Sequence, residues 1–218
     1  MKLYYCETLN PRKACAVARH LPLPVDFVRI DLASGEHRRP PFLAINPNGK
    51  VPVLQDGDWS LWESNAIMCH LSDMAQADLW PHDRRQVEVM RWLSWDSQHF
   101  TRHAGTLWFE HLIKPHLGLG EPDPVTVEEA TGHFRTFARV LDDHLSSRKY
   151  LVADVLSVAD FAVASALPDA NGAHLPLEEF LAIQRWHDRL NELPAWRTPY
   201  PERTAGQGAR PAKAGIAT

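Results

Sequence analysis

One stretch of the chain decides the fold that we expect for its first half. From residue 46 to residue 64 it reads Asn-Pro-Asn-Gly-Lys-Val-Pro-Val-Leu-Gln-Asp-Gly-Asp-Trp-Ser-Leu-Trp-Glu-Ser. Residues 51–55 and 59–62 are apolar segments on either side of a turn that contains Gly57, and this pattern predicts a β-hairpin. Ser64 then opens a run with apolar residues at helical spacing, so we expect a helix with Ser64 as its N-cap.

The same stretch carries the groups that an extended peptide ligand needs. Pro52 cannot donate a hydrogen bond to a strand, so it belongs on a sheet edge or in a special, cis, bond, and Val51 then offers its backbone groups to a ligand. Lys50 suits a carboxylate at one end of such a ligand. Glu63 suits an ammonium group at the other end, where Ser64 and the helix N-terminus suit a second carboxylate. The stretch therefore predicts a site for a small zwitterionic peptide.

The rest of the first half alternates strand and helix patterns. Residues 2–6 and 25–31 have the composition of strands, and a short helix is expected at 41–44. Asn10 fits the N-cap of a helix over 11–21 that begins with proline. The resulting order, βαβαββα, predicts a parallel strand pair and an antiparallel edge formed by the hairpin.

The second half has helical spacing throughout. We expect a long helix that starts near Val87 and is interrupted near Gly105, and another over 125–145 with its apolar residues on one face. Ser157 followed by Asp160 is close to the capping-box pattern. The chain then divides into an α/β domain at 1–75, a linker at 76–84, an all-helical domain at 85–201 and a mobile tail at 202–218.

Length, charge and cysteine content exclude several classes of protein. The 218 residues carry a formal net charge of -4, which gives no electrostatic case for nucleic acid or an anionic membrane. No apolar signal region or bilayer-length run is present, so we expect a soluble cytoplasmic protein. Three cysteines without a Cys-x-x-Cys pair argue against a disulfide scaffold and a dithiol redox site. Any redox chemistry therefore needs a thiol from the ligand.

Two stretches resemble motifs of a known family. Residues 46–54 with Glu63 and Ser64 are similar to the glutathione-binding motif of the cytosolic glutathione S-transferase superfamily. Residues 150–161 are similar to its buried N-capping motif, with Ala153 where the family usually has glycine, a change that matters little if the residue has a negative φ. The resemblance covers roughly residues 2–200 and implies a thioredoxin-like N-terminal domain, an all-helical C-terminal domain, glutathione bound as co-substrate at a cis-proline loop, and a homodimer.

The resemblance also implies which residues hold glutathione and activate its sulfur. Val51, Pro52, Glu63 and Ser64 are expected to contact the tripeptide, with Lys50 at its carboxylate unless this is an ordinary solvated lysine. His37 matches a position that reaches the glycyl end in some classes. The activating group lies in the turn after the first strand, where a hydroxyl or amide donor and a helix N-terminus lower the thiol pKa from about 8.5.

That turn contains no serine, but Thr8-x-Asn10 resembles the Thr-x-Asn arrangement of the nu-like bacterial members, for which disulfide reduction with glutathione is the better-supported activity. We expect Thr8 to donate its hydroxyl, and Asn10 its amide, to the sulfur. Alternatively, Asn10 only caps the helix and Thr8 is only a turn residue. Cys6 at the strand end is a third candidate, although a lone cysteine on a buried strand is more often inert.

Two features of the long helix bear on further ligands. His99 and His103 have the spacing of a metal pair, but no cysteine or carboxylate is clearly placed beside them, so we expect a solvated or cleft-lining face and no metal. By the resemblance, His103, Trp108 and Phe109 line a pocket for a hydrophobic second substrate. Core packing is the alternative for these three side chains.

Together these expectations describe a glutathione S-transferase that transfers glutathione to electrophilic small molecules through a stabilised thiolate. Two alternatives share the fold: a glutathione-dependent disulfide or peroxide reductase, and a non-catalytic binding protein. The last would be expected to have lost its ligand pocket, whereas Val51, Pro52, Glu63 and Ser64 are all present. The expected partners are glutathione, a hydrophobic electrophile or disulfide, and a second copy of the chain.

Overall fold

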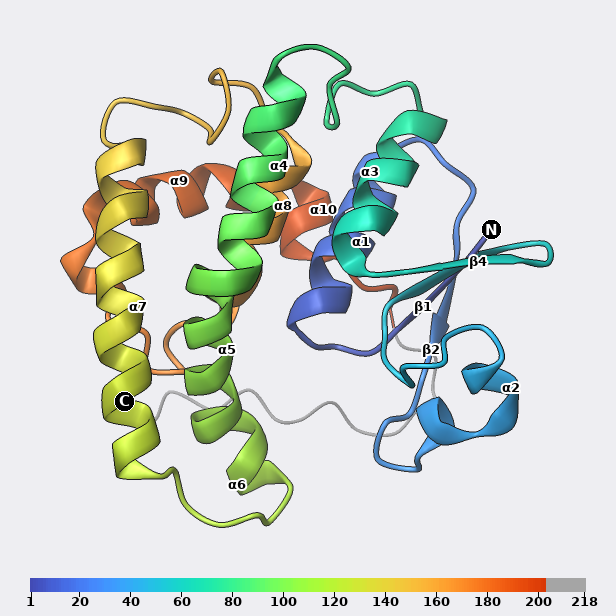
Figure 1. Ribbon diagram of the computed structural model, residues 1–218, viewed down its shortest axis with the longest axis horizontal. Coiled ribbons are helices and arrows are strands. Elements are labelled where there is room, and N and C mark those ends of the chain that lie inside the picture. The colour runs from blue at the N-terminus through green and yellow to red at the C-terminus, as the bar shows by residue number, and fades with distance from the viewer. Residues whose placement is uncertain (203–218) are drawn as a thin grey trace.

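The first half of the chain folds around a mixed β-sheet. The computed structural model describes residues 1–202, and in this range the sheet has the strand order β2-β1-β3-β4. β1 is parallel to β2 and antiparallel to β3, and β3 and β4 form the antiparallel hairpin, which confirms the predicted architecture (Figure 1). The strands are β1 (Lys2–Tyr5), β2 (Asp26–Arg29), β3 (Val53–Asp56) and β4 (Trp59–Trp62).

Helices lie on both faces of this sheet. Figure 1 shows α1 and α3 between the sheet and the second half, and α2 on the other side. Because neighbouring residues of a strand point to opposite faces, Leu54 packs into the main core, whereas Val53 packs with Ile30 and Phe42 in a smaller one. The elements are α1 (Leu9–His20), a 3₁₀ turn (Glu36–Arg38), α2 (Pro40–Leu43) and α3 (Ser64–Met74).

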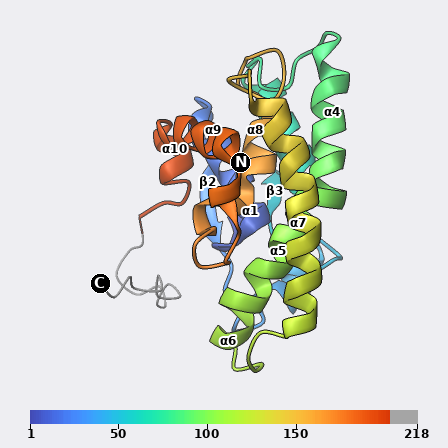
Figure 2. The ribbon, with the colours of Figure 1, turned by 90° about the vertical axis from the view of Figure 1, so that its left-hand side faces the viewer.

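The second half is helical. α4 and α5 follow each other end to end, and α7 lies beside them (Figures 1 and 2). α7 buries the apolar stripe that the sequence predicts. The helices are α4 (Arg85–Trp95), α5 (Thr101–Trp108), α6 (Lys114–His116), α7 (Pro124–Leu145), α8 (Val158–Val163), α9 (Leu181–Asn191) and α10 (Pro194–Arg197). Shorter 3₁₀ segments cover Ala164–Asp169 and Leu177–Glu179.

The expected interruption at Gly105 is wrong. Gly105 lies inside α5, and the helical path from α4 to α6 instead changes its hydrogen-bond register at two π-helical turns, Asp96–Phe100 and Phe109–Ile113. One glycine destabilises a helix by only about 1 kcal/mol relative to alanine, which tertiary packing readily offsets. Here α5 packs against α7, and a Cβ added to Gly105 would meet Leu9 Cδ1 at 3.6 Å.

Two helix starts differ from prediction by one or two residues. α1 begins at Leu9 with Thr8 as its N-cap residue in extended conformation (φ -134°, ψ 171°), so Asn10 is not the cap but the second helical residue. α3 begins at Ser64, and Glu63 occupies the cap position with φ 74°. Pro11 misled the first prediction because a proline fits anywhere in a first turn, where its missing N–H has no helical partner.

The predicted capping box at the start of α8 is confirmed. Asp160 is fully buried and accepts hydrogen bonds from Ser157 N (2.9 Å), Ser157 Oγ (3.1 Å), Leu151 N (3.0 Å) and Trp186 Nε1 (3.0 Å). These bonds connect α8, α9 and the preceding loop. Ala153 in that loop has φ 50°, so the condition under which its replacement of glycine would matter little is not met.

A buried ion pair joins the two halves. Lys13 Nζ of α1 lies 3.7 Å from Asp96 Oδ2 at the end of α4, and Thr101 Oγ1 donates to Asp96 Oδ1 at 2.5 Å. Both charged side chains are almost completely buried. Burial lowers the pKa of Lys13 and raises the pKa of Asp96, while the attraction within the pair opposes both shifts. Glu63 is close enough for its charge to oppose the shift of Lys13 as well.

Residues 75–84, between α3 and α4, form turns and bends. Of the tail expected at 202–218, only residue 202 falls within the described residues. In the described part of the chain, no helix combines the length and apolar character needed to cross a membrane.

Candidate functional site

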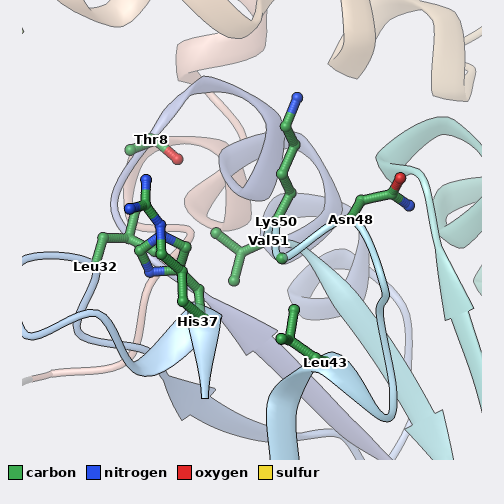
Figure 3. Close-up of a pocket in the computed structure, with 9 residues that line it drawn as sticks. Thr8, Leu32, His37, Leu43, Asn48, Lys50 and Val51 are labelled. Carbon is green, nitrogen blue, oxygen red and sulfur yellow. The ribbon is translucent and has the colours of Figure 1, made fainter. Parts of the chain in front are cut away.

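Two adjoining cavities lie where the loop before β3, residues 46–52, meets the starts of α1 and α3. The larger has a volume of about 450 Å³, the smaller about 200 Å³, and they share Asn48, Lys50 and Val51. Figure 3 shows the larger cavity, with the Thr8 hydroxyl turned toward Val51 and Lys50. It is lined by Thr8, Leu32, His37, Arg38, Leu43, Asn48, Gly49, Lys50 and Val51. The smaller is lined by Asn10, Asn46, Asn48, Lys50, Val51, Pro52, Glu63 and Ser64.

The loop between the cavities is held by Asn46. The Val51–Pro52 peptide bond is cis, as the sequence suggested. Buried Asn46 donates from Nδ2 to the Lys50 carbonyl at 2.7 Å and accepts from the Asn48 backbone N–H at 3.0 Å. The side chain therefore replaces backbone partners that the loop lacks, and it fixes the path of residues 48–51. Sequence reasoning quoted Asn46 within the motif but assigned it no role.

The N-terminus of α1 presents donors to the larger cavity. Within residues 1–202, the Thr8 side chain makes no capping hydrogen bond to α1, so its hydroxyl is available to a ligand. The first helical N–H groups, those of Leu9 and Asn10, have no partners within the helix itself, and Pro11 has no N–H at all. A hydroxyl beside the positive end of a helix dipole suits an anion such as a thiolate.

The smaller cavity brings α1 and α3 together. Ser64 Oγ donates to Asn10 Oδ1 at 3.5 Å, and Ser64 is 6% exposed at the first position of α3. Glu63 has φ 74° and ψ 113°, a conformation that costs a non-glycine residue about 1–3 kcal/mol and that concentrates at functional sites. It places a carboxylate at the mouth of the cavity, one residue before the helix N-terminus. The Glu63 carboxylate can accept from an ammonium group, and Ser64 with the N-terminus of α3 can donate to a carboxylate, so together they suit an amino acid zwitterion.

The structure gathers every predicted binding residue at these cavities, and the two predicted sulfur donors line adjoining ones. Thr8 lines the larger cavity and Asn10 the smaller one, where it contacts Ser64. Sequence reasoning missed Arg38, to which it assigned no role. Its neighbour His37 was the available signal. The other lining residues that it missed are Leu32, Leu43, Asn46, Asn48 and Gly49.

The residues expected at a hydrophobic pocket line neither cavity. Trp108 donates from Nε1 to Asp169 Oδ2 at 3.1 Å, and Phe109 is 41% exposed. His103 stacks on His133 of α7 with ring centroids 4.6 Å apart. His103 and Trp108 therefore have partners within the fold, and the role of the three residues at a second-substrate pocket stays a prediction.

The protein's own thiols and histidines do not form a reactive centre in the described part. Burial, followed by the charge of Glu7, raises the pKa of Cys6, so its thiol stays protonated near neutral pH. Burial also raises the pKa of Cys69, to about 12. Among residues 1–202, no group of three His, Cys, Asp or Glu side chains is arranged to hold a metal ion, and His99 stacks on Phe137. A reactive sulfur at this site must therefore come from a ligand.

A four-stranded sheet with a cis-proline loop, followed by an all-helical half, is the architecture of a glutathione-binding transferase. Residues 1–73 match the family model described as the glutathione S-transferase N-terminal domain, and residues 124–202 match the glutathione S-transferase C-terminal domain. The chain therefore belongs to the glutathione S-transferase family, and it is a glutathione S-transferase in fold and enzyme class.

Relatives of known name are similar over nearly the whole chain. Glutathione S-transferase 3 of Zea mays is 34% identical over 90% of this chain and 91% of its own length. Glutathione S-transferase GstB of Escherichia coli K12 is 30% identical over 88% of this chain and 92% of its own. Among solved structures, glutathione S-transferase I from mais in complex with an atrazine glutathione conjugate has a TM-score of 0.83 at 28% identity, covering 91% of this chain and 95% of that one.

Proposed function

We propose that the two cavities bind glutathione in an extended form across Val51, with its γ-glutamyl end in the smaller cavity and its cysteinyl and glycyl residues in the larger one. The continuity of the cavities through the loop before cis-Pro52 carries this assignment. The backbone groups of Val51 pair with the cysteinyl residue in the manner of an added strand. The sulfur then lies beside Thr8.

Each end of the tripeptide meets groups of matching charge. In the smaller cavity, Ser64 and the N-terminus of α3 receive the α-carboxylate, and Glu63 receives the α-ammonium group. In the larger cavity, His37, Arg38 and Lys50 surround the glycyl carboxylate. The described residues give Arg38 and Lys50 no ion-pair partner, so both remain available to an anion.

The reaction that follows is nucleophilic attack by the bound thiolate. The thiol proton leaves for solvent, the sulfur lone pair forms a bond to an electrophilic carbon, and the leaving group departs with its electron pair. Thr8 and the first turn of α1 stabilise the thiolate and thereby raise its fraction near neutral pH. Asn10 supports this electrostatically from the smaller cavity rather than by direct contact with sulfur.

A second candidate activity is disulfide reduction by glutathione. The Thr8-x-Asn10 turn favours this activity. Because burial raises the pKa of Cys6, every thiol that takes part must come from glutathione. The bound thiolate would attack a disulfide, and a second glutathione would release oxidised glutathione from the mixed disulfide. Two thiols are oxidised and one disulfide is reduced, so the exchange balances.

Paired turnover on one sample separates these activities. One assay supplies glutathione with an aryl halide, and the other supplies glutathione with a small disulfide, coupled to glutathione reductase. The proposal expects the aryl halide to be turned over, and Lys50→Met to raise the KM for glutathione about tenfold. Lys149→Met, at an exposed lysine of the second half, is the control. If neither assay shows turnover although glutathione is still bound, the protein would instead be a binding protein.

We also propose a homodimer that works in the cytoplasm. Large apolar side chains are exposed on β4, α3 and α4, including Trp62, Met74, Val87 and Met90, and a second copy would cover such a surface. Cys6, Cys15 and Cys69 are free thiols, as expected in a reducing compartment. Sedimentation velocity tests the dimer: Met90→Glu should yield monomers, whereas Leu181→Glu on α9 should not. A monomeric wild type would contradict it.

A further inference from the structure

The end of the described chain returns to the turn that carries Thr8. Tyr200 follows α10, and its hydroxyl donates a hydrogen bond to the Thr8 carbonyl oxygen at 3.2 Å. The Tyr200 ring stacks on Tyr5 of β1, with centroids 5.4 Å apart and planes inclined by 13°. Tyr5 is itself 3% exposed. Packing of the ring therefore holds the hydroxyl at the Thr8 carbonyl.

A second contact ties the same segment to α1. Arg12 donates from Nη2 to the Trp196 carbonyl at 2.8 Å, and its guanidinium lies over the Trp196 ring, 5.0 Å from the centroid. Trp196 is fully buried, and α10 packs beside α1 (Figure 1). The segment 196–200 thus contacts the first turn of α1 at both Arg12 and Thr8.

Two hydrogen bonds at one oxygen fix the peptide unit between Thr8 and Leu9. The Thr8 carbonyl accepts from the Arg12 backbone N–H at 3.0 Å, and also from Tyr200. Because a trans peptide is planar with its C=O and N–H opposed, the Leu9 N–H then points away from the helix, at its N-terminus. The direction of this N–H, and the placement of the Thr8 side chain, both depend on where the carbonyl is held.

We propose that Tyr200 is a positioning residue for the glutathione thiolate, holding the Thr8 carbonyl so that the Thr8 hydroxyl and the Leu9 N–H stay aimed at the sulfur. This inference rests on the proposed role of Thr8. Tyr200, at the C-terminal end of the helical half, would then act at a site whose other residues all belong to the first domain. Burial raises the pKa of Tyr200 well above its ordinary value, so the hydroxyl keeps its proton over the range of a turnover assay.

The test compares two tyrosines that each lose one hydrogen bond. Tyr200→Phe removes the bond to Thr8 and keeps the ring on Tyr5. Tyr4→Phe is the matched control, because Tyr4 donates to Gln55 Oε1 at 2.8 Å in the same domain. The readout is the pH midpoint of thiolate formation in bound glutathione, followed by the ultraviolet absorbance of the thiolate, together with kcat against pH.

We expect Tyr200→Phe to raise the midpoint by about 0.5 pH unit, and therefore to lower kcat about threefold at pH values below the midpoint. At high pH, where the thiolate is fully formed, the rates of Tyr200→Phe and wild type should converge. Tyr4→Phe should leave the midpoint where it is. Since Tyr200 acts partly through the Thr8 hydroxyl, the double variant with Thr8→Val should shift the midpoint by less than the sum of the two single shifts.

Each other outcome has a definite meaning. An unchanged midpoint in Tyr200→Phe, or an equal rise in Tyr4→Phe, overturns the inference. A Tyr200→Phe protein that does not fold also overturns it, because the hydroxyl would then serve folding instead of positioning. If Thr8→Val raises the midpoint and Tyr200→Phe does not, only this inference fails. If neither variant changes the midpoint, the proposed role of Thr8 fails as well.

Discussion

Replacing Lys13 with methionine should destabilise the protein by about 3–5 kcal/mol at pH 7. Lys13 and Asp96 are 2% and 0% exposed, and their charged atoms are 3.7 Å apart. At that distance and an effective dielectric constant of about 20, two unit charges attract by about 4.5 kcal/mol. Removal of one partner leaves the other charge buried without compensation, and such losses measure about 3–5 kcal/mol. This is a large share of the roughly 5–15 kcal/mol that stabilises a native protein.

A double-mutant cycle in urea is the assay for the pair. Asp96→Asn should cost a similar amount, because it leaves the Lys13 ammonium buried, whereas the double variant should recover most of the loss. The cost of Lys13→Met should also shrink as the pH falls toward 4. Burial holds the folded pKa of Asp96 above its ordinary 3.8, so protonation removes the unpaired charge and favours the folded state.

Two results would refute this reasoning. Single variants that each cost less than about 1 kcal/mol would mean that water reaches the pair. Costs that simply add in the double variant would mean that Lys13 and Asp96 do not interact, and that the halves of the molecule are joined by apolar packing alone.

Three further predictions concern stability and binding. Burial lowers the pKa of His187 to about 4, so the folded state binds fewer protons than the unfolded state between pH 4 and 6.5. The contribution of His187 to the free energy of unfolding should be fully present above pH 6.5 and fall by up to about 3 kcal/mol as the pH drops to 4. Urea titrations should show this pH dependence in the wild type and its loss in His187→Gln. Ala153→Gly should raise the melting temperature by about 1–3 °C, since φ 50° strains alanine; a lower melting temperature would contradict this. Gly49→Ala should weaken glutathione binding in calorimetry, because φ is +59° and an added Cβ would lie 3.1 Å from the His37 carbonyl oxygen. Gly57→Ala is the control, with φ +58° and nothing within 4 Å of the added Cβ, and it should lower the stability without changing glutathione binding. Equal glutathione affinities in the two glycine variants would count against the cavity assignment.

The parts of the fold that follow local rules were predictable. The hairpin comes from two apolar segments around a glycine turn, and the capping box from two residues three apart, so short-range patterns specify both. Helix starts were less predictable because a first turn accepts proline at several positions, which moved the expected cap from Thr8 to Asn10. The interruption at Gly105 failed for the opposite reason, since packing between elements outweighed a local preference.

The binding residues near cis-Pro52 were predictable because they form one continuous motif. Arg38 was not, since only the tertiary fold brings its loop to the cavity. Lys13 was not, because lysine is seldom buried and its partner lies 83 positions further along the chain. Tyr200 is a stronger case, because it lies 192 positions from Thr8 in the sequence and no local pattern links the two. Contacts of this kind are decided by the tertiary fold.

We propose above all that Thr8, at the N-terminus of α1, stabilises the thiolate of bound glutathione. The most direct measurement is the pH midpoint of thiolate absorbance for glutathione bound to the wild type and to Thr8→Val. A charge-assisted hydrogen bond is worth about 1.5–3 kcal/mol, so the wild-type midpoint should lie at least about one unit below the ordinary thiol value of about 8.5 and rise by about 1–2 units in Thr8→Val, with glutathione still bound. A wild-type midpoint near 8.5, or no rise in Thr8→Val, would contradict the claim.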